Sequence, residues 1–200
     1  MFGHFFTLFF EVNNMDKRKL MDLLEQCPVI AAVHDRYFDK AVASPCEVIF
    51  LLGSNILTIP QRIKEAHEAN KCIFIHTDLA DGLGKDRAGV QFCAQAGADG
   101  IISTRANLIR SARDLGLLTV QRFFALDSQG VDSIQELLDH SCPDLMEIMP
   151  GVIGKIIKRF ANGKVPLIAG GLVETKEDVT SALKLGAYAV STGKEALWYI

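Results

Sequence analysis

Two glycine-bearing segments near the end of the chain have the residue types that bind an anionic group. Residues 170–171 follow the apolar run 167–169, and residues 191–193 follow the apolar run 187–190. Glycine lets a backbone approach a ligand closely, and free amides at such turns bind phosphate. The alternative, which the pattern leaves open, is that these glycines serve only tight turns and helix caps. The predicted phosphate-binding residues are Gly170, Gly171, Ser191, Thr192 and Gly193.

Polar side chains stand at the ends of several other apolar runs. Glu147 lies inside the run 145–149, where an unpaired buried carboxylate would be costly. We therefore expect it to face a cation or a hydroxyl-bearing ligand. A structural ion pair with Arg122 or Arg105 is the alternative, and a solvated loop is the alternative for Lys85. The predicted residues on the hydroxyl-binding side are His76, Asp78, Lys85, Arg105 and Glu147.

Eight apolar runs alternate with helical patterns along the chain, without a linker or a break in composition. The expected strands are 29–33, 48–53, 72–76, 100–103, 118–125, 145–149, 167–169 and 187–190. Strands that alternate with helices form parallel sheets, and eight units in a chain of this length favour a closed barrel. We predict one α/β domain, a single TIM (β/α)8 barrel over residues 15–200, whose polar strand ends share one mouth.

The first 14 residues are rich in phenylalanine but too short to span a bilayer. They hold no Lys or Arg before the apolar run and no small-residue cleavage site after it, unlike a secretory signal. Met15, followed by charged residues, resembles the usual start of a protein more closely. We expect 1–14 to be an extension outside the fold, and we expect no membrane partner.

The cysteines and the motif content predict a cytoplasmic protein without a metal or a cofactor, whose polar groups suit binding a phosphorylated polyol at least as well as catalysis. The five cysteines, at positions 27, 46, 72, 93 and 142, form no metal-binding spacing, and we expect them to be reduced. No expected strand ends in a lysine placed for Schiff-base chemistry, and no H-E-x-x-H motif occurs. We therefore assign no catalytic residue.

The net charge of −3 indicates no general affinity for nucleic acid, so RNA contact would need a local basic patch. Two expected helices carry such patches. Solvated helix faces often have the same composition, which is the alternative. The candidate RNA contacts are Arg110, Arg113, Lys155, Lys158 and Arg159.

Five segments resemble those of the bacterial glycerol uptake operon antiterminators. They are 74–86, 98–105, 121–128, 146–151 and 168–173. The resemblance extends from about Met15 to Ile200, and it uses several motifs in order. It implies a regulator that responds to glycerol 3-phosphate, binds the leader of the nascent messenger RNA and prevents a terminator hairpin from stopping transcription.

The resemblance thus implies an effector ligand, glycerol 3-phosphate, and a leader mRNA partner, with a homo-oligomer possible. Two alternatives stay open. A TIM-barrel isomerase, aldolase or phosphodiesterase-like enzyme would act on a small phosphorylated metabolite, because barrels host many chemistries. An RNA-binding module would bind RNA equally well with or without the ligand.

Overall fold

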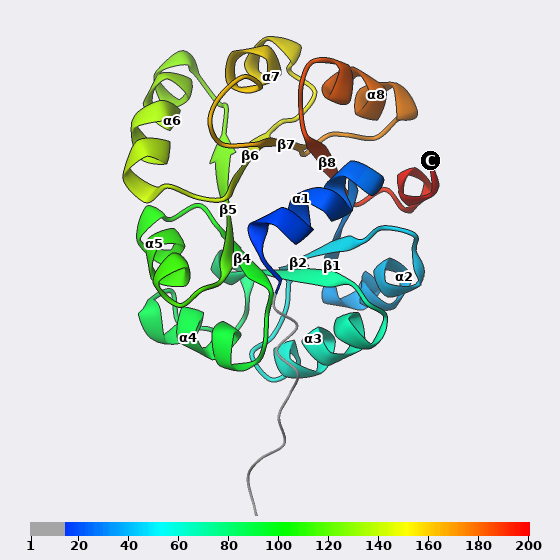
Figure 1. Ribbon diagram of the computed structural model, residues 1–200, viewed down its shortest axis with the longest axis vertical. Coiled ribbons are helices and arrows are strands. Elements are labelled where there is room, and N and C mark those ends of the chain that lie inside the picture. The colour runs from blue at the N-terminus through cyan, green and yellow to red at the C-terminus, as the bar shows by residue number, and fades with distance from the viewer. Residues whose placement is uncertain (1–14) are drawn as a thin grey trace, which may run out of the picture.

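The computed structural model describes residues 15–200, in which eight parallel strands form one closed barrel inside a ring of helices (Figure 1). The predicted single TIM barrel is confirmed. The prediction for residues 1–14 lies outside the described residues. The strands are β1 (Val29–His34), β2 (Val48–Gly53), β3 (Cys72–His76), β4 (Gly100–Ser103), β5 (Leu118–Phe124), β6 (Leu145–Met149), β7 (Leu167–Gly170) and β8 (Ala189–Thr192).

The helices are α1 (Lys17–Gln26), α2 (Phe38–Ala43), α3 (Ile59–Glu68), α4 (Arg87–Gln95), α5 (Ala106–Asp114), α6 (Ser128–Ser141), α7 (Gly154–Phe160) and α8 (Lys176–Lys184), with short 3-10 turns at Asp35–Tyr37, Thr77–Leu79 and Glu195–Tyr199. Helix α1 precedes the first strand, and each of the other helices follows one of the strands β1 to β7. Asp86, Asp127 and Thr175 cap three of these helices through side-chain oxygens. Thr175 and Asp178 form the capping box that the sequence indicates.

The strands form because their apolar runs are buried on both faces. One set of side chains packs outward against the helices, and the alternating set fills the barrel. Leu20 and Leu24 of α1 join the inner set and close the end of the barrel where the strands begin (Figure 1). The opposite end, where the strands finish, is therefore the mouth.

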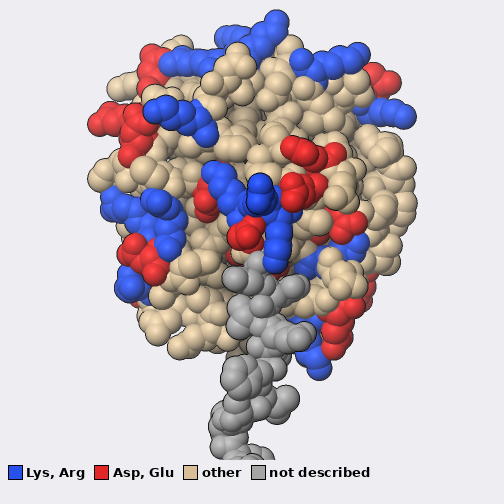
Figure 2. All heavy atoms as spheres, in the orientation of Figure 1, with Lys and Arg blue, Asp and Glu red and all other residues tan. Residues whose placement is uncertain are grey.

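The face covered by α1 carries Lys and Arg side chains next to Asp and Glu side chains (Figure 2). Charges of both signs alternate there, so the described part of this face has no concentrated positive field of the kind that attracts nucleic acid. Among residues 15–200, no helix is both long and apolar enough to cross a membrane.

Candidate functional site

The mouth of the barrel holds a layer of polar side chains that point inward from the ends of the strands. Arg122 of β5 lies in register with Glu147 of β6, and Gly170 of β7 lies in register with Ser191 of β8. His76 ends β3 and is 2% exposed. Beneath these residues the interior is apolar, so the polar layer marks the level at which a ligand would meet the barrel.

Glu147 is the central residue of this layer. Its side chain is fully buried, and its Oε2 lies 2.6 Å from Nε of Arg122, which is 5% exposed. The hydroxyl of Ser191 donates a hydrogen bond to the other carboxylate oxygen, Oε1. The structure therefore contains the ion pair that the sequence left open as an alternative. A direct contact of Glu147 with a ligand stays a prediction.

Gly170 allows this contact between Glu147 and Ser191. A β-carbon on Gly170 would overlap both the Glu147 carboxylate and the Ser191 hydroxyl, which it would approach to 2.6 Å. The carboxylate of β6 can reach β8 only because the strand between them has no side chain at this level. The glycine is thus required by packing inside the barrel as well as by the loop that follows.

The loops after β7 and β8 present backbone amides at the mouth. Gly171 and Leu172 have φ of +71° and +58°. Within residues 15–200, the amides of Gly171, Leu172 and Gly193 donate no hydrogen bond. The hydroxyl of Thr192 donates to the carbonyl of Val173 at 2.8 Å, so the two loops are tied together. The predicted phosphate site stays a prediction, and the Leu172 amide is a further donor without a partner among the described residues of the same loop.

Asp78 and Arg105 lie together on the far side of the mouth, next to β3 and β4. Asp78 accepts hydrogen bonds from the Ser103 hydroxyl at 2.8 Å and from the Thr104 amide at 2.7 Å. Burial alone would raise the pKa of Asp78, but the bonds from Thr104 and Ser103 outweigh it and lower the pKa. Arg105 lies 3.7 Å from the same carboxylate, and its side chain is 53% exposed. Much of the Asp78 acceptor capacity is therefore used within the protein.

Lys85 is held by the loop in which it occurs. Its ammonium donates to the carbonyls of Thr77 and Ala80, the latter at 2.7 Å. The same loop is joined to the connection after β2, because the Asp81 amide donates to the Ser54 carbonyl at 2.8 Å. Lys85 thus stabilises a folded loop beside the mouth, and its contact with a ligand stays a prediction.

His76 is neutral at physiological pH. Burial, together with the nearby charge of Arg122, lowers its pKa to about 4. Among the described residues, neither its Nδ1 atom nor the Nη2 atom of Arg122 has a hydrogen-bond partner, although both atoms are buried. Two buried polar groups without partners in one polar layer are unusual in a native interior, where nearly all such groups are paired.

Arg122 is the residue that the sequence-based site did not include. Gln121 and Arg122 are adjacent, so one of them must point inward and the other outward. The Ser141 hydroxyl of α6 donates to the Gln121 side chain, which therefore points outward. A signal was present in the sequence, because a carboxylate inside the next strand requires a partner and Arg122 lies in register with it.

A model of the family described as glycerol-3-phosphate responsive antiterminators matches residues 29–198. The chain belongs to this family. The match includes every strand of the barrel and all of the polar residues at the mouth.

Several relatives of this antiterminator-family chain are similar over nearly their whole length. The uncharacterized protein YgcP of Escherichia coli K12 is 39% identical over 183 residues, which is 90% of this chain and 95% of YgcP. The crystal structure of the glycerol uptake operon antiterminator regulatory protein of Listeria monocytogenes strain 4b F2365 is 31% identical. The two structures align with a TM-score of 0.82, and the alignment covers 86% of this chain and 95% of the Listeria chain.

The glycerol uptake operon antiterminator-related protein of Thermotoga maritima MSB8 is 34% identical, with a TM-score of 0.77, and covers 85% of this chain and 96% of its own. Deoxyribose-phosphate aldolases are similar at 10 and 12% identity, which shows a shared fold alone. Within residues 15–200, no group of three or more His, Cys, Asp or Glu side chains is arranged to hold a metal ion.

The candidate RNA contacts of this antiterminator-family chain lie on two separate helices of the ring. Arg110 and Arg113 of α5 contact the end of α6, the former at His140 and the latter at the Ser141 carbonyl. Helix α6 lies between α5 and α7 in the ring (Figure 1). The two basic patches therefore flank α6 on either side.

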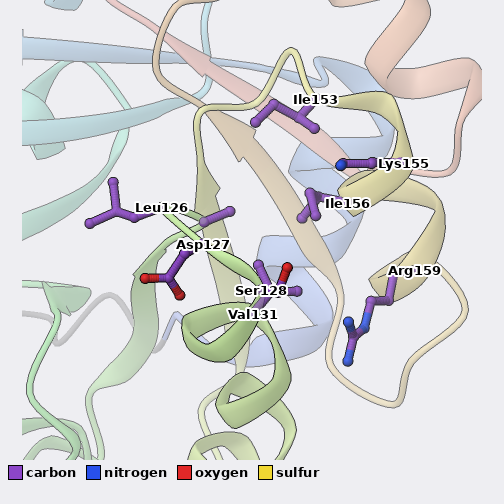
Figure 3. A pocket seen from close by; sticks show the side chains of 9 residues that line it. Leu126, Asp127, Ser128, Val131, Ile153, Lys155, Ile156 and Arg159 are labelled. Carbon is purple, nitrogen blue, oxygen red and sulfur yellow. The ribbon is translucent and has the colours of Figure 1, made fainter.

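Helix α7 carries the other patch. Arg159 pairs with Asp132 of α6 at 2.8 Å, whereas Lys155 and Lys158 are exposed and have no ion-pair partner among residues 15–200. Lys155 and Arg159 line a groove of about 390 Å³ between α7 and the first turn of α6 (Figure 3). Leu126, at the rim of that groove, is 84% exposed.

Proposed function

We propose that this chain is a glycerol 3-phosphate-responsive antiterminator that binds the leader mRNA of glycerol-utilisation genes and prevents termination of transcription. The observation that carries the proposal is the pair of loops after β7 and β8, in a chain of this family. Their three free amides, at Gly171, Leu172 and Gly193, are donors that a phosphate accepts. The backbone of 191–192 completes the proposed phosphate site.

The rest of the ligand would extend from these loops across the mouth. Arg105 lies on the side of the mouth opposite these loops. Its side chain is half exposed, so its guanidinium is available to a phosphorylated ligand. Asp78, Lys85, Glu147 and His76 are the other candidates for contact with the glycerol hydroxyls. No metal or cofactor enters this proposal.

A backbone connection leads from the proposed phosphate site to helix α7. The Gly151 amide, in the turn before α7, donates to the carbonyls of Gly170 and Gly171 at 2.5 and 3.1 Å. A β-carbon on Gly151 would approach the Gly170 nitrogen to 2.6 Å, so the turn and the loop are in close contact. A ligand that moves the 170–171 loop would therefore also move the start of the helix that carries Lys155 and Lys158. This is the route by which the ligand would favour the RNA-binding state.

The alternative is a barrel enzyme that acts on a small phosphorylated metabolite. Its support is the shared fold of distant aldolases, and fold alone does not assign a reaction. No strand among residues 15–200 carries a lysine, so the Schiff-base chemistry of such aldolases would have no nucleophile inside the barrel. We infer that the protein binds its ligand and does not consume it. We also propose that it acts in the cytoplasm, where transcription occurs. A homo-oligomer is compatible with this proposal.

The test is calorimetric titration with glycerol 3-phosphate, with glycerol and inorganic phosphate as controls, followed by recovery of the ligand. We expect saturable binding of glycerol 3-phosphate, which is returned unchanged, and tighter binding of leader RNA in its presence. Consumption of the ligand would favour the enzyme. RNA affinity that is the same with and without ligand would favour an RNA-binding module indifferent to metabolites.

A matched pair of variants tests the position of the phosphate. Gly171 and Gly116 have similar φ, +71° and +78°, so alanine strains the backbone similarly at both. Gly116 lies in the turn between α5 and β5, at the closed end of the barrel. We expect Gly171→Ala to weaken binding of glycerol 3-phosphate by about tenfold or more, the loss of one good contact, and Gly116→Ala to leave it unchanged. Equal affinities in the two variants would place the phosphate elsewhere.

A further inference from the structure

The interior of the barrel mouth has two buried polar atoms that the protein itself leaves unpaired. Nη2 of Arg122 and Nδ1 of His76 have no hydrogen-bond partner among the described residues. Arg122 and His76 are 5% and 2% exposed, so bulk solvent does not solvate them. Leaving such groups unpaired costs free energy, and a ligand that pairs them recovers it. The atoms therefore indicate where a ligand group belongs.

The chemistry of the two atoms favours a group that can both accept and donate, because such a group pairs with Arg122 and with Nδ1 of His76 in either tautomer of the ring. Arg122 Nη2 can only donate, and its charge is already balanced by Glu147 at 2.6 Å. His76 is neutral, because burial and Arg122 lower its pKa to about 4, so one of its ring nitrogens is an acceptor. A hydroxyl can accept from Arg122 and donate to histidine. An ionised phosphate oxygen or a carbonyl can only accept.

The neighbouring residues are consistent with a neutral, hydroxyl-bearing group. Each Glu147 carboxylate oxygen already accepts a hydrogen bond, from Arg122 or from Ser191, and the side chain is fully buried, so it is not presented to a ligand. Gly170 separates this layer from the free amides of the β7 loop, because it belongs to the strand end and the loop starts at Gly171. The phosphate site and the unpaired atoms are thus two parts of one mouth, one at its rim and one in its interior.

We propose that Arg122 and His76 form the subsite for the hydroxyl groups of the polyol phosphate and determine the specificity for them. This inference rests on the proposed function. In it, Arg122 and His76 take the place of Asp78 and Glu147 as direct partners of the hydroxyls. Glu147 and Ser191 then hold the Arg122 guanidinium in place. Because the unpaired atoms have no exposed surface, a ligand reaches them only when a covering side chain turns aside. Binding at this subsite is therefore coupled to a change at the mouth.

The experiment compares glycerol 3-phosphate with propyl phosphate, which keeps the three-carbon chain and the phosphate and lacks both hydroxyls. Dihydroxyacetone phosphate, with a carbonyl at the second carbon, is the intermediate probe. In the wild type we expect glycerol 3-phosphate to bind about 10- to 100-fold more tightly than propyl phosphate, the range for buried polar groups left unpaired. Equal affinities would overturn the subsite and leave the proposed function intact. Absence of any glycerol 3-phosphate binding would overturn the proposed function itself.

Two variants show which residues cause the difference in affinity between glycerol 3-phosphate and propyl phosphate. In His76→Phe, we expect propyl phosphate to bind as it does to the wild type and the preference for glycerol 3-phosphate to fall to within about twofold. Arg122→Lys keeps a positive charge for Glu147 but lacks Nη2, and it should lower the ratio in the same way. His140→Phe, on α6 and away from the mouth, is the control and should retain the ratio. A wild-type ratio in both mouth variants would show that only water meets these atoms.

Discussion

Gly170 and Glu147 lie so close that no side chain can occupy the position between the Glu147 carboxylate and Ser191. We predict that Gly170→Ala destabilises the protein by about 3 kcal/mol, the upper part of the usual range for overpacking a filled interior. The expected measurement is the free energy of unfolding in urea. Gly130→Ala is the control, because Gly130 lies in the first turn of α6, where alanine is favoured. A loss at position 170 no larger than at position 130 would contradict this packing.

The buried ion pair of Arg122 and Glu147 predicts strong coupling between two substitutions. Glu147→Ala leaves a buried guanidinium without its counter-charge, and removal of one partner from such a pair costs about 3–5 kcal/mol. The double variant Arg122→Met, Glu147→Leu removes both charges and keeps the volume, so we expect it to be more stable than Glu147→Ala alone. Denaturant unfolding of Arg122→Met, of Glu147→Leu and of the double variant measures the coupling. Additive effects would mean that the two side chains do not interact.

The eight strands could be predicted from the sequence because each is a continuous apolar run bounded by polar or glycine residues. Helix starts were less predictable. Apolar residues at helical spacing start at Ile56 in the sequence, whereas α3 begins at Ile59, because the Asn55 side chain accepts from the Leu57 amide and holds a turn there. Helix α6 begins at Ser128, six residues before the apolar Ile134, since Asp127 caps it and its first turn accommodates Gly130.

The loops after β7 and β8 could be located in the sequence because their glycines leave a local signal, and their binding of phosphate stays a prediction. The sequence left both Arg122 and Arg105 open as partners of Glu147, since the choice depends on which strands lie in register. Glu147 and Arg122 are 25 residues apart, and only the register of β5 against β6 brings them to 2.6 Å. The hydrogen bonds from Lys85 to nearby carbonyls likewise form only when the loop is folded, so the sequence does not show them.

The neutral state of His76 predicts a loss of stability in mild acid. Unfolded histidine binds a proton below pH about 6.5, whereas folded His76 does so only near pH 4, so acid favours the unfolded state between these values. We expect this residue to remove about 2–3 kcal/mol of stability between pH 7 and pH 4.5. The lowered pKa of Asp78 affects stability mainly below this range.

The measurement for His76 is the free energy of unfolding of the wild type and of His76→Phe at pH 7 and pH 4.5. The variant lacks the titrating ring, so its stability should fall less over the interval. Parallel losses in the two proteins would mean that His76 titrates as an exposed histidine does.

Lys155 and Lys158 are the cations on α7 that remain unpaired within residues 15–200, and they predict the salt dependence of RNA binding. Each phosphate contact on a single strand adds about 0.7 to the slope of log affinity against log salt. The double variant Lys155→Ala, Lys158→Ala should therefore lower that slope by about 1.4 and weaken binding without altering the affinity for glycerol 3-phosphate.

Lys64→Ala on α3 is the control for this prediction, since its charge lies on another helix and pairs with Glu68 at 3.7 Å. Fluorescence anisotropy of leader RNA at several salt concentrations, with and without glycerol 3-phosphate, provides the slopes. If Arg110→Ala, Arg113→Ala lowers the slope and the α7 variant does not, RNA binds at α5. The route from Gly151 to α7 would then not be the one that couples the ligand to RNA, because α6 separates the two helices.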